Sequence, residues 1–165
     1  MFPNRFAMRI IKRLDNFFSS KREVLAAYLF GSWAAGKFRK NSDADVAVLL
    51  SLSAAKKAFK FQMRWQEELA RILGTNVDLI ILNEADPLLK FQVYSKGLPA
   101  HVKMPASAEK FKWRAINEYW DWIPSQRILE KTALARMEKY GQRTYKPKNC
   151  SVGKGAKQNC RTHRP

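Results

Sequence analysis

The chain has 165 residues, with 31 Lys and Arg against 14 Asp and Glu, and its formal net charge at pH 7 is +17. Hydrophobic residues make up 46% and charged residues 27%, a composition that excludes global disorder and predicts a packed core. No window approaches the roughly 20 apolar residues of a membrane-spanning helix. The length fits one domain, and the charge indicates nucleic acid, a nucleotide, an anionic surface or an acidic partner without choosing among them.

Charge and apolar periodicity both divide the chain near residue 140. Residues 141–165 contain seven basic residues and no acidic one, so residues 1–140 keep 24 basic and 14 acidic residues, a net charge of +10. Periodicity also ends after Gly141. We therefore expect one domain over residues 1–140 and a basic, disordered tail over 141–165. Both cysteines, Cys150 and Cys160, lie in this tail, and such sparse use fits a reduced, cytoplasmic protein.

The first half of the chain shows helical and strand patterns in turn. Val46 and Val48 favour strand over helix in their apolar run, and Gly74 suits a helix C-terminus. In chain order we expect a helix near residues 4–20, strands at 24–30 and 45–50, a helix near 54–73 and a strand at 77–82. The core-facing stripe expected for the second helix consists of Ala58, Phe61, Trp65, Leu69 and Ile72.

The second half adds a short strand and more helices. We expect a helix from residues 83–86 to about 95, a strand at 98–102, a helix from 107 into Pro124 and a further helix to about 140. The helical period of Trp113, Ile116, Trp120 and Ile123 favours packing in the core, with a partner surface as the alternative. This order predicts an α/β (α+β) fold, a mixed sheet of about four strands with helices packed on it.

A turn of small residues follows the first strand, at Gly31-Ser32. If it opens a short helix, its backbone N–H groups lie beside the Ser32 hydroxyl and can bind an anion. Glycine lets a phosphate approach the backbone closely. By itself Gly31-Ser32 is an ordinary end of a strand.

Three aspartates stand at the start of the next strands. Asp43 and Asp45 are two residues apart, so on a strand both carboxylates project from one face. Such a pair repels unless cations neutralise it, and Mg²⁺ is a hard ion that prefers carboxylate and phosphate oxygens. Asp78 lies in the apolar run at 77–82, where it can complete a metal site or accept a proton from an attacking hydroxyl. Taken singly, each aspartate suits a solvated turn or a strand end.

Gly31-Ser32, ten intervening residues and Asp43-x-Asp45 resemble the signature of the nucleotidyltransferase superfamily that includes DNA polymerase beta. The surroundings of Asp78 and the segment at 82–91 are similar to minimal nucleotidyltransferases (MNT domains). These are small prokaryotic proteins, many of them antitoxins encoded beside a HEPN-domain toxin. The resemblance covers about residues 5–140 and implies the small nucleotidyltransferase fold.

The resemblance implies that the chain transfers AMP from ATP, bound with one or two Mg²⁺ ions, to a tyrosine of a HEPN ribonuclease toxin and so silences it. Gly31 and Ser32 would then hold the triphosphate. Asp43, Asp45 and Asp78 would be the catalytic, metal-binding carboxylates. Phosphoryl-type transfer needs little beyond positioning and charge neutralisation, so this short set can suffice.

The sequence departs from the family at two positions. Members often carry Arg where this chain has Trp33 and Ala35, so a charge that contacts phosphates is missing. Lys37, Arg39 and Lys40 lie nearby in sequence. The carboxylates are all present.

Three alternatives remain open at this point. The chain can be an antitoxin that acts by binding alone, or a small-molecule nucleotidyltransferase of the aminoglycoside-modifying kind. It can also bind nucleic acid through its basic surface, which would leave the three carboxylates without a use. We rank that possibility last, and we expect neither a membrane nor a nucleic acid as a direct partner.

Overall fold

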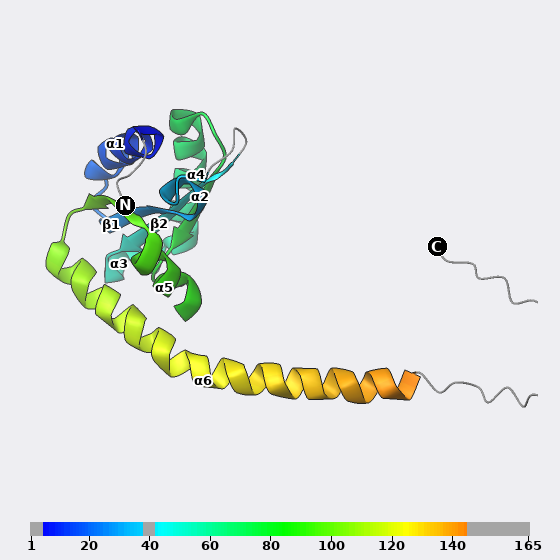
Figure 1. Ribbon diagram of the computed structural model, residues 1–165. Helices are drawn as coiled ribbons and strands as arrows, with labels where there is room; N and C mark the ends of the chain where they lie inside the picture. Colours follow the sequence, from blue (N-terminus) through cyan, green and yellow to red (C-terminus); the bar gives the residue numbers. More distant parts are fainter. Residues whose placement is uncertain (1–4, 38–41, 145–165) are drawn as a thin grey trace, which may run out of the picture. The chain divides into compact units, whose positions relative to one another are not determined.

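The computed structural model describes the backbone of residues 5–37 and 42–144 (Figure 1). The chain divides into two units, residues 1–125 and residues 126–165, and the sheet lies in the first. Most of the predicted tail, with Cys150 and Cys160, lies outside the described residues. The domain boundary at residue 140 therefore stays a prediction.

A four-stranded mixed sheet forms the centre of the first unit, in the order β3-β2-β1-β4. β1 pairs antiparallel with both β2 and β4, whereas β2 and β3 run parallel. The strands are β1 (Val24–Phe30), β2 (Ala44–Leu50), β3 (Val77–Ile81) and β4 (Leu98–Val102). The predicted mixed α/β sheet of about four strands is confirmed.

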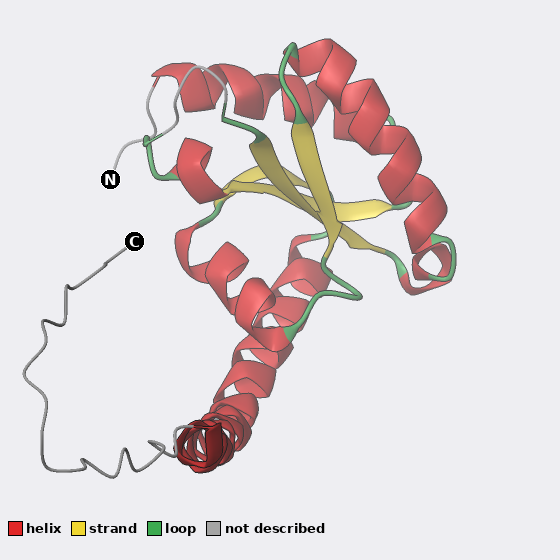
Figure 2. Ribbon diagram, turned by 90° about the vertical axis from the view of Figure 1, so that its right-hand side faces the viewer, coloured by secondary structure: helices red, strands yellow, loops and turns green. Residues whose placement is uncertain are grey.

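Helices cover both faces of this sheet (Figure 2). One face packs against α1 (Arg5–Ser19) and α4 (Ala58–Leu73), and the other packs against α5 (Pro87–Lys96) and the first turns of α6 (Pro105–Thr144). Two single-turn helices, α2 (Gly31–Ala34) and α3 (Leu52–Ala55), follow β1 and β2. No helix within the described residues is both long enough and apolar enough to cross a membrane.

The local sequence explains where α4 and α5 end and begin. Gly74 adopts a left-handed conformation (φ 72°) at the C-terminus of α4, which glycine reaches without strain. The Asp86 carboxylate accepts a hydrogen bond of 2.8 Å from the Leu89 N–H, and Pro87 occupies the first turn of α5. Both boundaries agree with the sequence to within a few residues.

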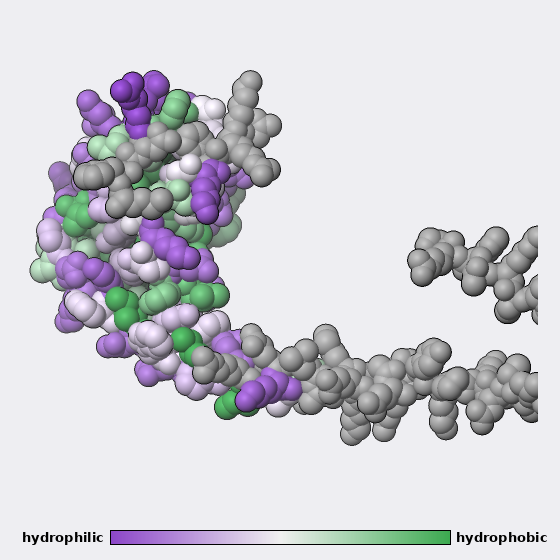
Figure 3. Space-filling view, viewed as in Figure 1, coloured by the Kyte–Doolittle hydropathy of each residue, from purple (hydrophilic) through white to green (hydrophobic). Residues whose placement is uncertain are grey.

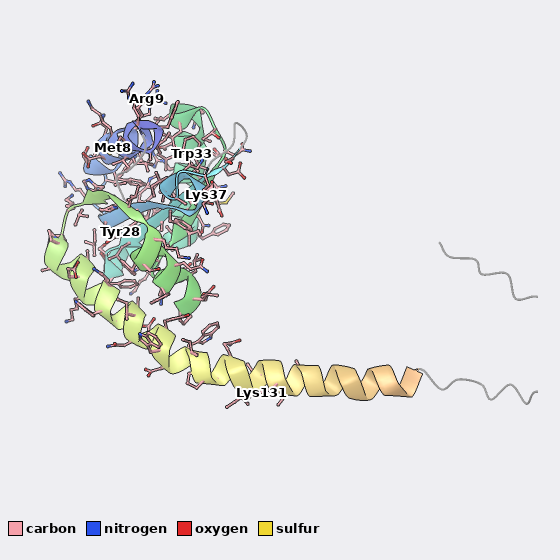
Figure 4. The ribbon with its side chains drawn as sticks, in the orientation of Figure 1. Met8, Arg9, Tyr28, Trp33, Lys37 and Lys131 are labelled. Atoms are coloured by element: carbon pink, nitrogen blue, oxygen red, sulfur yellow. The ribbon has the colours of Figure 1, made fainter. Side chains whose placement is uncertain are left out.

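The larger core lies between the sheet and helices α1 and α4. Phe18 of α1 and Trp65 of α4 are almost fully buried, and their rings meet edge to face at 6.0 Å between centroids. The solvent side of α1 carries basic residues, which appear as purple side chains in Figure 3 and include Arg9, labelled in Figure 4. This amphipathic pattern is why α1 was predictable from its sequence.

One predicted helix is wrong in detail. The helix expected over residues 54–73 is two elements, α3 and α4, because the chain turns at Lys56 and Lys57. The Ser51 side chain caps α3 by accepting the Ala54 N–H. Ile72, placed in the core-facing stripe, is 44% exposed, and Leu73 is buried instead.

The prediction that Pro124 ends a helix is also wrong, since α6 is helical from Pro105 to Thr144 with Pro124 inside it. A proline removes its own N–H bond but leaves those of the neighbouring turns available. Trp113 and Trp120, expected in the core, are each 61% exposed. Ala108 and Ala115 are buried in their place, because small side chains let a helix lie close to its neighbours.

The second unit is helical over its described part, residues 126–144. Ile128 and Leu129 are 63% and 58% exposed, and Lys131 is also exposed (Figure 4).

Candidate active site

The candidate site lies where β1 ends and α2 begins. Phe30 is extended, and Gly31 then turns the chain with a positive φ of 65°. α2 closes with hydrogen bonds from the Ala35 N–H to the Gly31 carbonyl (3.1 Å) and from the Lys37 N–H to the Ser32 carbonyl (2.9 Å). The short helix considered from the sequence is therefore present.

Gly31 is required here for two independent reasons. A side chain is strained at its positive φ. A Cβ built at Gly31 would also overlap the carboxylate oxygen Oδ2 of Asp45. The backbone of this turn and the Asp45 carboxylate are thus packed directly against each other, although they are fourteen residues apart in the sequence (45 − 31).

Asp45 and Asp78 are partners in the register of the parallel strands β2 and β3. Neighbouring strands lie about 4.8 Å apart, and partners in register project from the same face. This is the face that packs on α5, because Ala47 and Ile80, two residues after Asp45 and Asp78, project from the same face and belong to the core cluster beside α5. Asp45 is half-buried and Asp78 is exposed. The pair therefore lies near the N-terminal ends of β2 and β3, where solvent reaches it.

The surroundings of Asp45 make its charged form unfavourable. Burial raises the pKa of this carboxyl above its ordinary value, and the charges of Asp78 and then Asp43 raise it further. The backbone N–H of Ser32 donates a hydrogen bond to the carboxylate, which opposes the rise in pKa. A cation beside these carboxylates would remove the repulsion.

The loop that carries Asp43 is fixed from two sides. The Trp33 indole N–H and the Thr75 hydroxyl both donate to the Ser42 carbonyl, at 3.1 Å and 3.3 Å. The Ala44 N–H donates to the Asn76 carbonyl at 2.9 Å. Trp33 (labelled in Figure 4) thereby supports the loop before β2.

The donor set suits a hard cation. Carboxylate oxygens are the ligands that Mg²⁺ uses together with substrate phosphates. Among the described residues, no group of three or more His, Cys, Asp or Glu side chains is already arranged to hold a metal ion. The structure therefore offers the Asp45–Asp78 pair with Asp43 two residues before it, and phosphate oxygens would have to complete any coordination sphere.

A cavity of about 830 Å³ opens beside Asp45. Gly31 and Asp45 line it, whereas Ser32, Asp43 and Asp78 do not. The other lining residues come from α2 and its flanks, from the end of α5 and from the start of β4: Phe30, Ala34, Ala35, Lys37, Gln92, Ser95, Lys96, Gly97 and Leu98.

The sequence did not indicate that residues of α5 would line the cavity beside Asp45. Lys96 is in the last turn of α5, 51 residues after Asp45, and it belongs to no motif that we recognise. Pairing of Leu98 in β4 with Leu29 in β1 brings this turn beside Gly31. A correct prediction that β4 pairs with β1 would have been the signal needed to find it.

Comparison with known proteins supports the family expected from the motif. The family model described as "Polymerase beta, Nucleotidyltransferase" matches residues 12–99, which are 88 of the 165 residues. The protein adenylyltransferase MntA of Shewanella oneidensis is 39% identical over 72 residues, 42% of this chain and 48% of that protein. The alignment thus spans about half the length of this curated relative.

Solved structures show the same architecture over more of the chain. A crystal structure of a toxin–antitoxin complex with AMP-PNP contains a chain that is 27% identical, with a TM-score of 0.59 over 77% of this chain and 98% of that one. A structure of the tri-AMPylated HEPN toxin of Shewanella oneidensis in complex with the MNT antitoxin contains a chain that is 25% identical, with a TM-score of 0.54 over 78% of this chain and 96% of that one. The motif, the fold and these matches agree, and the chain belongs to the polymerase beta nucleotidyltransferase family.

Proposed function

We propose that this protein is an antitoxin that transfers AMP from ATP, with Mg²⁺, to a tyrosine hydroxyl of a cognate HEPN ribonuclease toxin and so neutralises it. The observation that carries the proposal is the placement of Asp45 between the Gly31 turn and Asp78. The relatives support the choice of acceptor, since one solved complex contains an AMPylated HEPN toxin. We place the reaction in the cytoplasm.

Each residue of the site has a role in this proposal. Gly31 and Ser32 hold the triphosphate against the start of α2, and Asp43, Asp45 and Asp78 bind the metal. Bound Mg²⁺ would neutralise phosphate charge and orient the triphosphate. Asp78 is exposed on β3, an edge strand of the sheet, and its carboxylate can also accept the proton of the incoming hydroxyl.

The transfer exchanges one phosphorus–oxygen bond for another. The tyrosine oxygen of the acceptor bonds to the α-phosphorus of ATP, and the bond from the α-phosphorus to the bridging oxygen breaks. Pyrophosphate leaves with that electron pair, and the hydroxyl proton passes to a carboxylate. The protein mainly positions the reactants and balances their charge, which is most of what phosphoryl-type transfer requires.

Labelled ATP tests this proposal directly. The full chain is incubated with Mg²⁺, ATP labelled at the α-phosphate, and the HEPN protein encoded beside it. We expect label on a tyrosine of that protein, dependent on Mg²⁺ and lost with Asp45→Asn. Absence of label on a folded partner would refute the proposal.

Protection in cells separates catalysis from binding. An antitoxin that acts by occlusion would still protect cells after Asp43→Asn, because the substitution leaves the folded surface almost unchanged. We expect the variant to bind the toxin and fail to protect. Full protection by Asp43→Asn would favour the binding-only alternative.

A further inference from the structure

The cavity beside Asp45 is lined by lysines from two different parts of the chain. The charged residues that line it within the described part of the chain are Asp45, Lys37 directly after α2, and Lys96 in the last turn of α5. Both lysines are exposed, and neither forms an ion pair with any other residue that the structure describes. Among the residues that the structure describes, two cations from different elements therefore line this cavity with a single carboxylate.

The volume and lining fit a small anionic ligand. Small-molecule sites usually occupy about 300–1,000 Å³, and this cavity has about 830 Å³. Lysine binds phosphate as a flexible point charge. Gln92, one turn before the end of α5, and Ser95, in its last turn, add neutral polar groups to the same wall.

α2 itself supplies no cation to this cavity. The Trp33 indole donates its N–H to the Ser42 carbonyl, and Ala35, which follows α2, is apolar. A triphosphate lying against Gly31 and Asp45 needs positive charge from elsewhere. Lys37 and Lys96 line the same cavity as Gly31 and Asp45 and can provide it (Lys37 is labelled in Figure 4).

We propose that Lys96, together with Lys37, binds the phosphates of the nucleoside triphosphate. This inference rests on the proposed function and adds a binding residue from α5 to the motif on β1, α2 and β2. Lys96 is a binding residue here and takes no part in proton transfer.

A structural role for Lys96 makes a different prediction. A lysine in the last turn of a helix interacts favourably with the helix dipole, so Lys96→Ala can lower the stability of α5 without any effect on ligands. A purely structural role would lower the unfolding temperature and leave nucleotide affinity and KM unchanged.

The test measures affinity for a non-hydrolysable ATP analogue with Mg²⁺ by calorimetry, on the full chain and without the toxin. Lys96→Ala should raise Kd about tenfold, the effect of losing one charge-assisted contact, and Lys96→Arg should restore most of the affinity. Lys103→Ala is the matched control. It removes an exposed lysine just beyond the opposite end of β4, outside the cavity, and should leave Kd unchanged.

Kinetics and salt supply a second measurement. Lys96→Ala should raise KM for ATP with little change in kcat, and should make Kd less sensitive to ionic strength. If Lys96→Ala and Lys103→Ala have the same Kd and KM as the unmodified chain, the inference is wrong while AMP transfer stands. If the unmodified chain binds no Mg²⁺–nucleotide, both this inference and the proposed function are overturned.

Discussion

Gly31, the first residue of α2, and Gly36, two residues after its end, have similar positive φ angles of 65° and 69° but different surroundings. A Cβ at Gly31 would overlap the Asp45 carboxylate, whereas nothing lies within 4 Å of a Cβ at Gly36. Alanine in a left-handed conformation costs about 1–2 kcal/mol at either position. We expect Gly31→Ala to lose AMP transfer at least a hundredfold, because it must also displace Asp45, and Gly36→Ala to lose only stability.

Thermal unfolding and toxin labelling, measured on both variants, check this prediction. Equal unfolding temperatures together with very different transfer rates would assign the loss at Gly31 to the displaced carboxylate. Equal transfer rates in the two variants would show that Asp45 can move aside without consequence.

Asp45 should make stability depend on pH. Its pKa is raised by burial and by the charges of Asp78 and Asp43, so the folded state keeps a proton at pH values where the unfolded chain has released it. The contribution of Asp45 to stability is therefore largest below the ordinary pKa and is lost as pH rises through the raised value. At neutral pH, Asp45→Asn should unfold a few degrees higher than the unmodified chain, and the difference should shrink on acidification.

Thermal scans from neutral pH to about pH 4, without added metal, measure this effect. Asp121→Asn, which changes an exposed carboxylate on α6, serves as control and should leave the unfolding temperature unchanged. A lower unfolding temperature for Asp45→Asn at neutral pH would contradict the proposed repulsion. Added Mg²⁺ should stabilise the unmodified chain more than Asp45→Asn.

At the scale of elements, α5 connects the cap at Asp86 to the cavity at Lys96. The Asp86 carboxylate accepts the Leu89 N–H at 2.8 Å. Asp86→Ala removes this cap and should lower the free energy of unfolding by about 1 kcal/mol. Denaturant titration measures the loss, and Asp86→Asn should retain most of the stability because asparagine caps helices about as well. If Asp86→Asn were as unstable as Asp86→Ala, charge and not capping would be responsible.

The strands and the amphipathic helices were predictable because their own sequences specify them. Val24–Phe30 is apolar and breaks at a glycine, and α1 presents one apolar face. α6 was not predictable in the same way. Whether Pro124 ends a helix, and whether Trp113 is buried, depends on packing against residues distant in the sequence.

The candidate site was predictable only where it is local in sequence. Gly31, Ser32, Asp43 and Asp45 belong to one short segment with a characteristic spacing, and Asp78 was found because a carboxylate is conspicuous in an apolar strand. No spacing rule connects this segment to Lys96, since the pairing of β4 with β1 brings them together. The roles assigned to Lys96 and to the residues of this segment stay predictions until the variants above are measured.

At the scale of the whole molecule, the net positive charge is unevenly distributed along the chain. Residues 145–165 hold six of the basic residues and no acidic one, so removing them lowers the net charge from +17 to +11. All residues named for the candidate site, and every strand in the described part of the chain, lie within residues 24–102. A chain ending after Thr144 should therefore keep its unfolding temperature and transfer AMP within about twofold of the full rate.

Unfolding and labelling assays on the shortened chain check this expectation. A shortened chain that folds normally, binds nucleotide and no longer labels the toxin would show that the basic extension helps to recruit the acceptor. If the shortened and full chains label the toxin at equal rates at both low and moderate salt, the basic extension contributes nothing to this reaction.

The closely spaced carboxylates of β2 and β3 also connect nucleotide supply to the lifetime of the protein. A cation or Mg²⁺–nucleotide that binds only the folded chain must stabilise it, by about 2.7 kcal/mol when its concentration is one hundred times Kd. Proteases act on chains that have opened, so such stabilisation lowers the fraction available for degradation. Under the proposed function, cells rich in ATP would thus retain more of this protein, while depletion of ATP would expose it to turnover.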